Sequence, residues 1–430
     1  MHPACERYPS ELINNLPSFL CPETVLFDQL PKYGLSEPGQ KHSLFTAAFL
    51  HWFDVQVIGW QIVSNSMNEK TIENKRYFVN PVVDFIFIGG LSFILFAFLL
   101  LFYTDVRTPA VISTALFFSW VINWPHFSMS TYRLYQSRSN IQQYPITSYV
   151  IPFVILGGIV LCYSFPDQVA PYFVKLFILW SPYHYSGQTI GITFIYAMRS
   201  GIKLTTHERR LITWFVLGTY FVSTLRAETS REGFSFYGVQ YPSMQIPYWI
   251  AQTAEYAMWA LMVAFAVWIV YWSYKNKKIL PWIIVLPAAT QYMWFIQTVY
   301  TPSFQEFVPM LHSLQYILIA WGIQLKMKME LKQIEPSKKY VVSETSRWFA
   351  INLVGGAILF YFLPMIGTGM GYTSLFSIAV IYAAVQIHHF FVDGVIWKLK
   401  NQTVSHPLMM TFEELTTPQS SPRRTSEVAA

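Results

Sequence analysis

The stretch VVDFIFIGGLSFILFAFLLLFY, Val82–Tyr103, decides the fold of this chain. It is as long as the ~20 apolar residues that a helix needs to cross the hydrocarbon core of a bilayer. Its one charged residue, Asp84, stands near its beginning, where we expect it to cap the helix close to the membrane surface. The stretch therefore predicts a membrane-spanning helix.

The composition extends this prediction to the whole chain. Of the 430 residues, 53% are hydrophobic and 12% are charged, whereas soluble chains carry roughly 25% charged residues. The apolar residues also gather in long runs, which favours an all-α fold, a polytopic transmembrane helix bundle of about 10–11 spans. The candidate spans are Leu44–Val63, Val82–Tyr103, Pro109–Tyr132, Ser148–Phe165, Pro171–Met198, Leu211–Leu225, Ile246–Tyr274, Ile279–Val299, Phe307–Leu325, Trp348–Met365 and Tyr372–Trp397.

Two of these runs, Leu44–Val63 and Leu211–Leu225, are the weakest candidates. The first contains His51 and Asp54, so an interfacial helix is an alternative for it. Pro418–Ala430 is rich in Ser, Thr, Pro and Arg, which is typical of a disordered tail. The predicted organisation is a polar N-terminal segment (1–43), a transmembrane helical domain (44–400) and a disordered cytoplasmic tail (401–430).

The charged loops predict an orientation. Basic loops around Arg209, Lys277 and Lys339 alternate with connections that are poor in Lys and Arg. The positive-inside rule places the basic loops and the C-terminus in the cytoplasm, and an odd number of spans then leaves the N-terminus outside. These loops account for the net charge of +6, and no nucleic-acid motif accompanies it. The predicted partner is therefore the lipid bilayer and not a nucleic acid.

Histidines inside the apolar runs are the main functional signal. In VQIHHFFVDGVIWKLK, Val385–Lys400, two histidines and Asp393 lie in a predicted span. Charged groups at the centre of a membrane helix cost ~2.5–3.5 kcal/mol on insertion scales, so polar groups there need partners and suggest function. Each histidine of the set lies within about 7 Å of the middle of its run, if the His126 helix continues past Pro125 to near Tyr135. The set is His51, His126, His184, His312, His388 and His389.

Most of these histidines have a polar partner one helical turn later, on the same helix face. A metal-bound imidazole typically donates its second N–H to such a group. The same pairs would also serve as structural hydrogen bonds, but the common depth favours one shared metal site. The pairs are His51 with Asp54, His184 with Gln188, His312 with Gln315, and His389 with Asp393.

The roles follow from these pairs. We expect Asp393 and Gln188 to orient imidazoles, and Glu255 to complete the site or relay protons, with Glu255 and Asp393 as the catalytic carboxylates. The residues that we expect to hydrogen-bond to the metal-binding imidazoles also include Asp54 and Gln315. Arg133, Arg199 and Arg226 stand near predicted helix ends, where we expect them to reach the interface. The predicted metal ligands are His126, His184, His312 and His389, with His51 in reserve and His388 facing a neighbouring helix or a second ligand.

This donor set suits iron, copper or zinc. Three or four histidines with an open coordination position are typical of a non-haem iron oxygenase, so Fe(II) is the predicted cofactor, with copper, zinc and axially ligated haem as alternatives. The absence of C-x-x-C and C-x-x-C-H argues against a thiolate zinc site and covalently attached haem. The chain is 18% aromatic, and aromatic residues flank the histidines, which favours an apolar lipid-like substrate entering from the bilayer.

Histidines spread over a polytopic, aromatic-rich helical chain resemble the integral-membrane β-carotene-cleaving dioxygenases of the bacteriorhodopsin-related-protein family. The nearest fragments are NWPHF, Asn123–Phe127, and HHFFVD, His388–Asp393. The two histidines four residues apart that the family pattern includes are absent here. The resemblance implies a single iron held by histidines from several helices, and oxidation of a carotenoid or isoprenoid.

Two other functions compete with a metalloenzyme. A proton- or ion-coupled transporter would also bury His, Asp and Glu, but would place them in a row along the membrane normal. A scaffold that binds partner proteins through its cytoplasmic loops and tail would use the histidines for stability alone.

Overall fold

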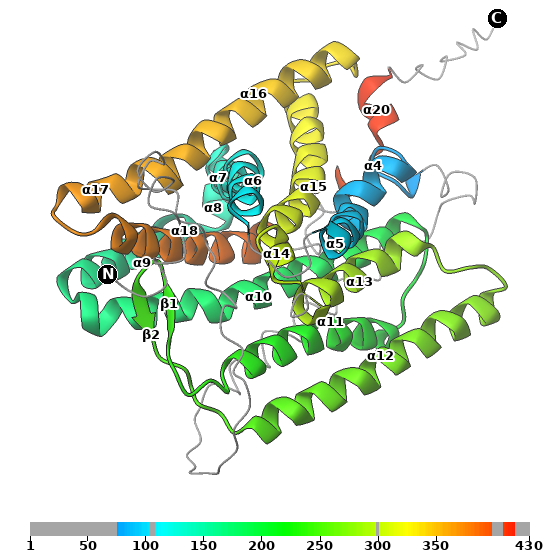
Figure 1. Ribbon diagram of the computed structural model, residues 1–430. Coiled ribbons are helices and arrows are strands. Elements are labelled where there is room, and N and C mark those ends of the chain that lie inside the picture. Colours follow the sequence, from blue (N-terminus) through cyan, green and yellow to red (C-terminus); the bar gives the residue numbers. More distant parts are fainter. Residues whose placement is uncertain (1–74, 103–107, 298–300, 398–406, 418–430) are drawn as a thin grey trace, which may run out of the picture.

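The structure, a computed structural model, describes residues 75–102, 108–297, 301–397 and 407–417. Within these ranges it is almost wholly helical, so the predicted all-α helix bundle is confirmed (Figure 1). Each predicted span that begins at Val82 or later coincides with a helix. Leu44–Val63 with His51 and Asp54, and the segment 1–43, lie outside the described residues.

Five helical stretches of the described chain are long and apolar enough to cross a membrane: Pro81–Phe102, Ile146–Ser164, Tyr248–Asn276, Lys338–Gly369 and Ser374–Ile396. The protein is therefore a membrane protein by the length and composition of its helices. The positions of the two termini relative to the membrane stay a prediction.

The elements follow in chain order. They are α4 (Pro81–Phe85), η2 (Ile86–Gly90), α5 (Leu91–Phe102), α6 (Pro109–Phe118), η3 (Ser119–Asn123), α7 (Trp124–Tyr135), α8 (Arg138–Gln143), η4 (Ile146–Val150), α9 (Ile151–Ser164), α10 (Pro166–Arg199), α11 (Thr206–Ala227), β1 (Phe234–Phe236), β2 (Val239–Tyr241), α12 (Tyr248–Asn276), α13 (Trp282–Ile296), α14 (Pro302–Gln305), α15 (Val308–Leu331), α16 (Lys338–Ala357), η6 (Ile358–Phe362), α17 (Leu363–Gly369), α18 (Ser374–Ile396), η7 (Pro407–Met409) and α20 (Phe412–Thr416).

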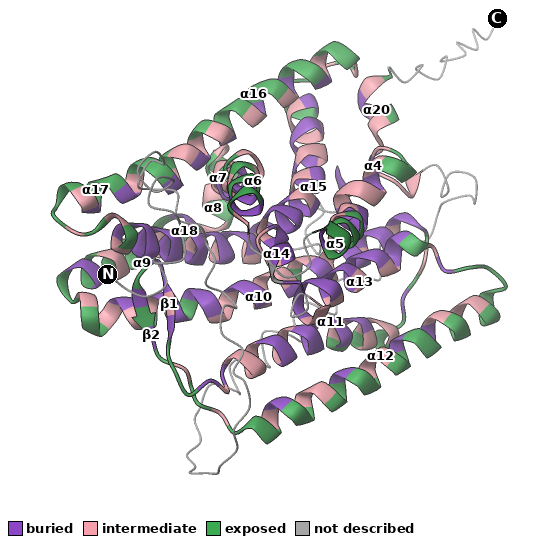
Figure 2. Cartoon of the chain, viewed as in Figure 1, coloured by how far each residue is buried: buried purple, intermediate pink, exposed green. Residues whose placement is uncertain are grey.

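Helices α10 and α18 form the centre of the bundle. They pack against each other, α7 packs against α18, and α11 and α13 pack against α10 (Figure 1). In the most apolar part of α18, 72% of the residues are buried, against 17% in α12, which lies at the edge of the bundle (Figure 2). Exposed aromatic residues such as Trp249 and Tyr256 on α12 suit a surface in contact with lipid.

The helix that carries His126 runs through Pro125 to Tyr135, as predicted. The π-helical turn η3 ends directly before Trp124, so the helix widens where Pro125 cannot donate a backbone hydrogen bond. Helix α16 crosses this segment closely, since a Cβ atom on Gly356 would lie 2.7 Å from the backbone carbon of Trp124. Glycine is therefore required for this contact between α7 and α16.

The segment Pro407–Thr416 corrects the prediction of disorder from residue 401 onward. It forms η7 and α20, and Leu408 and Leu415 are buried against the bundle. Arg199, predicted to reach the interface, is instead 1% exposed and donates to the backbone carbonyls of Leu408 and Met410. A guanidinium can satisfy several carbonyls at once, which makes its burial possible. The residues from 418 onward lie outside the described residues.

The other predicted interfacial groups also have specific partners. Arg133 is buried, and its guanidinium lies 4.1 Å above the ring of Trp397. Asp84, in the first turn of α4, accepts hydrogen bonds from the backbone N–H groups of Phe78 and Val79 at 2.7 and 3.0 Å. Asp84 therefore fixes the chain that leads into α4, whereas Asn80 caps the helix, and Asp84 is fully buried and not at an exposed surface.

A short hairpin between α11 and α12 was not predicted. Strands β1 and β2 pair antiparallel, with Phe236 opposite Val239, and the turn between them places Tyr237 and Gly238 at positive φ. The hairpin packs on α10, where Lys175 forms a buried ion pair with Glu228. Strands of three residues are too short to show a periodic pattern in the sequence.

Candidate metal centre

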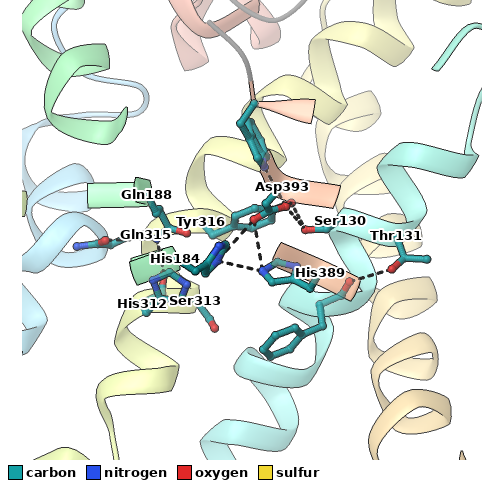
Figure 3. Close-up of polar contacts among 12 residues, drawn as sticks. Ser130, Thr131, His184, Gln188, His312, Ser313, Gln315, Tyr316, His389 and Asp393 are labelled. Carbon is teal, nitrogen blue, oxygen red and sulfur yellow. Dashed lines mark hydrogen bonds and ion pairs between the residues drawn. The ribbon is translucent and has the colours of Figure 1, made fainter. Parts of the chain in front are cut away.

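Four histidines from four helices meet in the interior. His126 comes from α7, His184 from α10, His312 from α15 and His389 from α18. Neighbouring ring centres around this group are 4.5 Å apart for His126 and His389, 4.8 Å for His389 and His184, 5.3 Å for His184 and His312, and 5.3 Å for His312 and His126. Figure 3 shows His184 and His389 turned toward each other, with His312 beside them.

A proline residue lies shortly before three of the four histidines in the sequence. Pro125 directly precedes His126, Pro182 lies two residues before His184, and Pro309 lies three residues before His312. Serines four residues after two of these prolines bond the proline carbonyls through their hydroxyl groups, a contact that serine often makes within a helix. Ser186 donates to the carbonyl of Pro182 at 2.9 Å, and Ser313 donates to that of Pro309 at 2.8 Å.

Three donor atoms form a triangle of the size that a metal ion needs. The Nε2 atoms of His184 and His389 are 3.2 Å apart, and Asp393 Oδ2 lies 3.8 Å from the first and 3.3 Å from the second. The point equidistant from these three atoms is about 2.0 Å from each, which is the usual length of a metal–imidazole or metal–carboxylate bond. The triangle is thus already at coordination distance.

His126 joins this group. One ligand atom from each of His126, His184, His389 and Asp393 lies within 4.8 Å of the others, so the four residues could hold a metal ion. None of these residues identifies the metal, because imidazole and carboxylate ligands serve iron, copper and zinc alike. Cys162, the one cysteine in the described part of the chain, is buried in α9 and is not part of the group.

The two carboxylate oxygen atoms of Asp393 contact different groups. Oδ1 accepts hydrogen bonds from Ser130 Oγ at 2.6 Å, from Trp397 Nε1 at 3.2 Å and from Tyr316 OH at 3.5 Å. Oδ2 faces the two imidazoles. The carboxylate is therefore fixed through one oxygen and offers the other to the centre, in the way that bound carboxylates are usually supported.

Several ring nitrogens in this group are buried without a hydrogen-bond partner. His126, His312 and His389 are 0%, 1% and 1% exposed. Both ring nitrogens of His126 and of His312, and Nδ1 of His389, are unpartnered. A buried polar group without a partner costs about 1–3 kcal/mol, so this arrangement is unfavourable unless a further group binds there. A metal ion accepts electron pairs from such nitrogens and removes part of this cost.

Aromatic rings enclose the imidazoles. Tyr185 stacks on His312 with ring centres 3.8 Å apart, and Phe390 stacks on His184 at 4.7 Å. Tyr316 stands edge-on to His126 at 4.1 Å, and Phe127 to His389 at 4.7 Å. These contacts fix the planes of the rings and exclude water, which strengthens electrostatic interactions inside the site.

Some predicted site residues do not reach the centre. Glu255 lies on α12 and pairs with Arg226 at 2.5 Å, so its predicted place in the site is wrong. Its basic partner lies on the preceding helix, α11, and both side chains are only partly buried. His388 is only partly buried and outside the metal-binding group, because adjacent helical residues point about 100° apart.

The predicted orienting amides bind elsewhere. Gln188 donates to the backbone carbonyl of His312 at 3.0 Å and its Oε1 has no partner, so it does not orient an imidazole. Gln315 donates to the carbonyl of Ile88 at 2.5 Å. Both amides instead join α10, α15 and η2. The contact of Trp397 with Asp393 was not predicted, although its position four residues later on α18 was a usable signal.

No protein family, curated protein or solved structure matches this chain. The resemblance to the carotene-cleaving dioxygenases thus stays a prediction. The assignment of the site rests on the geometry of its donor atoms and on their burial.

Proposed function

We propose that this protein is an integral-membrane metal-dependent oxidoreductase with a non-haem iron centre, and that it oxidises an apolar, lipid-like or isoprenoid substrate. The observation that carries this proposal is the triangle of His184 Nε2, His389 Nε2 and Asp393 Oδ2, with sides of 3.2, 3.3 and 3.8 Å. Two histidines and one carboxylate with open positions are the donor set of non-haem Fe(II) oxygenases.

The geometry argues against haem. Two axial imidazoles hold their ligating nitrogens about 4 Å apart on opposite sides of a macrocycle. The nitrogens of His184 and His389 are 3.2 Å apart and face each other directly, which leaves no space for a porphyrin between them. Iron, copper and zinc ions all fit the distances, and we favour iron because two histidines and one carboxylate with open positions recur in non-haem Fe(II) oxygenases.

The surroundings support an apolar substrate taken from the bilayer. Tyr185, Phe390 and Phe127 pack directly on the imidazoles, and α18, which carries His389 and Asp393, is one of the five helical stretches that are long and apolar enough to cross a membrane. The side chains of His184 and Asp393 keep 9% and 7% of their surface, more than the 1% of His389. We therefore place the approach of the substrate on the side of His184.

A proton- or ion-coupled transporter is less well supported. It requires ionisable groups that follow one another across the membrane. Here the histidines and Asp393 gather at one point, and Glu255 is paired with Arg226.

Metal content tests the proposal. The protein is purified in mild detergent, and iron, copper and zinc are quantified per chain beside an absorption spectrum for haem. We expect close to one ion per chain, lost in His184→Ala and His389→Ala and retained in His388→Ala, the matched control outside the group. An iron-loaded sample should then consume oxygen when supplied with an apolar isoprenoid. A folded protein that binds none of these metals refutes the proposal.

A further inference from the structure

Resting on the proposed function, we infer that His312 joins His126, His184, His389 and Asp393 as a fifth ligand of one ion. The centre then keeps a single open position. Such a centre binds a small ligand through one donor atom, as dioxygen does, and does not bind a chelating cosubstrate such as a 2-oxo acid or a catecholate. The apolar substrate reacts beside the metal without binding to it.

The spacing of the four rings carries this inference. An imidazole bound at about 2.1 Å has its ring centre about 3.2 Å from the metal. Two such rings on one ion have centres about 4.5 Å apart at right angles and about 5.2 Å apart at the tetrahedral angle. The four neighbouring separations here are 4.5, 4.8, 5.3 and 5.3 Å. The ring centre of His312, 5.3 Å from those of His126 and His184, thus lies at a separation that suits two imidazoles on the same ion.

The ring of His312 must move toward that ion, because His312 lies outside the group whose ligand atoms are within 4.8 Å of one another. Both of its ring nitrogens are buried without a partner, so no hydrogen bond has to break. Its backbone is fixed, because Gln188 donates to its carbonyl at 3.0 Å. The ring of Tyr185, stacked 3.8 Å away and inclined by 14°, leaves sliding parallel to that ring as the easy movement. A structural histidine would have at least one nitrogen paired at this depth.

Asp393 fills one position and not two. Its Oδ1 is occupied by Ser130 at 2.6 Å and Trp397 at 3.2 Å, so only Oδ2 is free to bind. Four imidazoles and one carboxylate oxygen make five donors. Octahedral iron has one position left, whereas a centre with two histidines and one carboxylate has three. A chelating ligand needs two adjacent positions and is therefore excluded while His312 is bound.

The experiment counts the imidazole ligands and the open coordination positions of the iron. It uses the full-length protein in detergent, loaded with Fe(II) in the absence of oxygen. X-ray absorption at the iron edge gives the number of imidazoles, and we expect four. Nitric oxide then tests for one open position, and we expect one Fe–NO signal per iron. Catechol, added after the iron has been oxidised to Fe(III) with ferricyanide, tests for two adjacent positions, because the catecholate charge-transfer band belongs to Fe(III). We expect no catecholate charge-transfer band in the wild-type protein and a clear band in His312→Ala, with His388→Ala behaving as wild type.

The outcomes separate the two proposals. An iron-loaded protein with three imidazoles, or a wild type that binds catechol as well as His312→Ala does, overturns the inference and leaves the metal centre in place. A protein that takes up no iron overturns the proposed function itself. If His312→Ala does not fold, the number of imidazoles and the catechol test on the wild-type protein still decide whether His312 is a ligand. A count of four with no catechol band supports the inference.

Discussion

Asp393 Oδ2 lies 3.3 Å from His389 Nε2, one helical turn away on α18, and the other oxygen of the same carboxylate is held by Ser130 from α7. One side chain thus joins two helices and presents a charge to the imidazoles. A carboxylate in this position compensates the charge of a divalent ion in a site that water does not reach. The metal affinity should accordingly depend on this charge.

Replacement of Asp393 by asparagine tests the charge alone. Asp393→Asn keeps the size of the side chain but offers a neutral oxygen, so the affinity for a divalent ion should fall at least ~10–100-fold. Competition with a coloured chelator measures the affinity. Glu255→Gln is the matched control, because Glu255 lies outside the group and should leave the affinity unchanged. An equal loss of metal affinity in both variants would contradict the assignment of Asp393 as a metal ligand.

The supporting hydrogen bonds should also affect the metal. Ser130→Ala removes the 2.6 Å bond to Asp393, and Tyr316→Phe removes the hydroxyl that contacts Ser130 at 2.5 Å. Loss of such outer partners typically lowers metal affinity ~10–100-fold. Thr131→Ala is the control, since the hydroxyl of Thr131 donates to the backbone carbonyl of Phe127 in the same helix. Unchanged affinity in Ser130→Ala would show that the carboxylate needs no such support.

The metal-free protein should become more stable when His312 is made apolar. His312→Leu removes two buried unpartnered nitrogens, which should raise the free energy of unfolding of the metal-free form by about 1–3 kcal/mol. Asn352→Leu should lower it, because the amide of Asn352 bonds Ser128 and the carbonyl of Trp348. Thermal unfolding in chelator measures both. A loss of stability in His312→Leu would indicate a structural histidine.

The contact between α7 and α16 should control the position of His126. Gly356→Val would press a side chain against the backbone of Trp124, only 2.7 Å from the new Cβ atom, and move α7. We expect a loss of metal from a protein that remains helical by circular dichroism. Gly369→Val is the control, because nothing lies within 4 Å of its Cβ position. Full metal content in Gly356→Val would show that α7 adjusts without moving the histidine.

The sequence predicted the long helices because they coincide with apolar runs, five of which in the described chain are long and apolar enough to cross a membrane. It also predicted that His126, His184, His312 and His389 belong together, since a polar group in such a run needs partners. What lies opposite a helix face is not encoded in the spacing along that helix. For this reason Gln188 was assigned to an imidazole, although the backbone of α15 is its partner.

The same limit explains the error at Glu255 and the unexpected order of the C-terminal segment. No residue one helical turn from Glu255 indicates its partner. Only the packing of α11 on α12 places Arg226 beside it. Residues Pro407–Thr416 are too few to form an apolar run of membrane-spanning length, yet the carbonyls of Leu408 and Met410 accept from the buried Arg199 and hold the segment in place. Contacts between distant parts of the chain decide both cases.

The buried guanidinium of Arg199 has a consequence for biogenesis. Two of its carbonyl partners, on Leu408 and Met410, follow it by 209 and 211 residues, so they leave the ribosome long after α10 has entered the membrane. During that interval the cation has too few acceptors for its depth. Arg199 Nη1 therefore lacks both of its acceptors until nearly the whole chain has been translated, whereas Nε and Nη2 can already donate to the carbonyls of Arg76 and Tyr77.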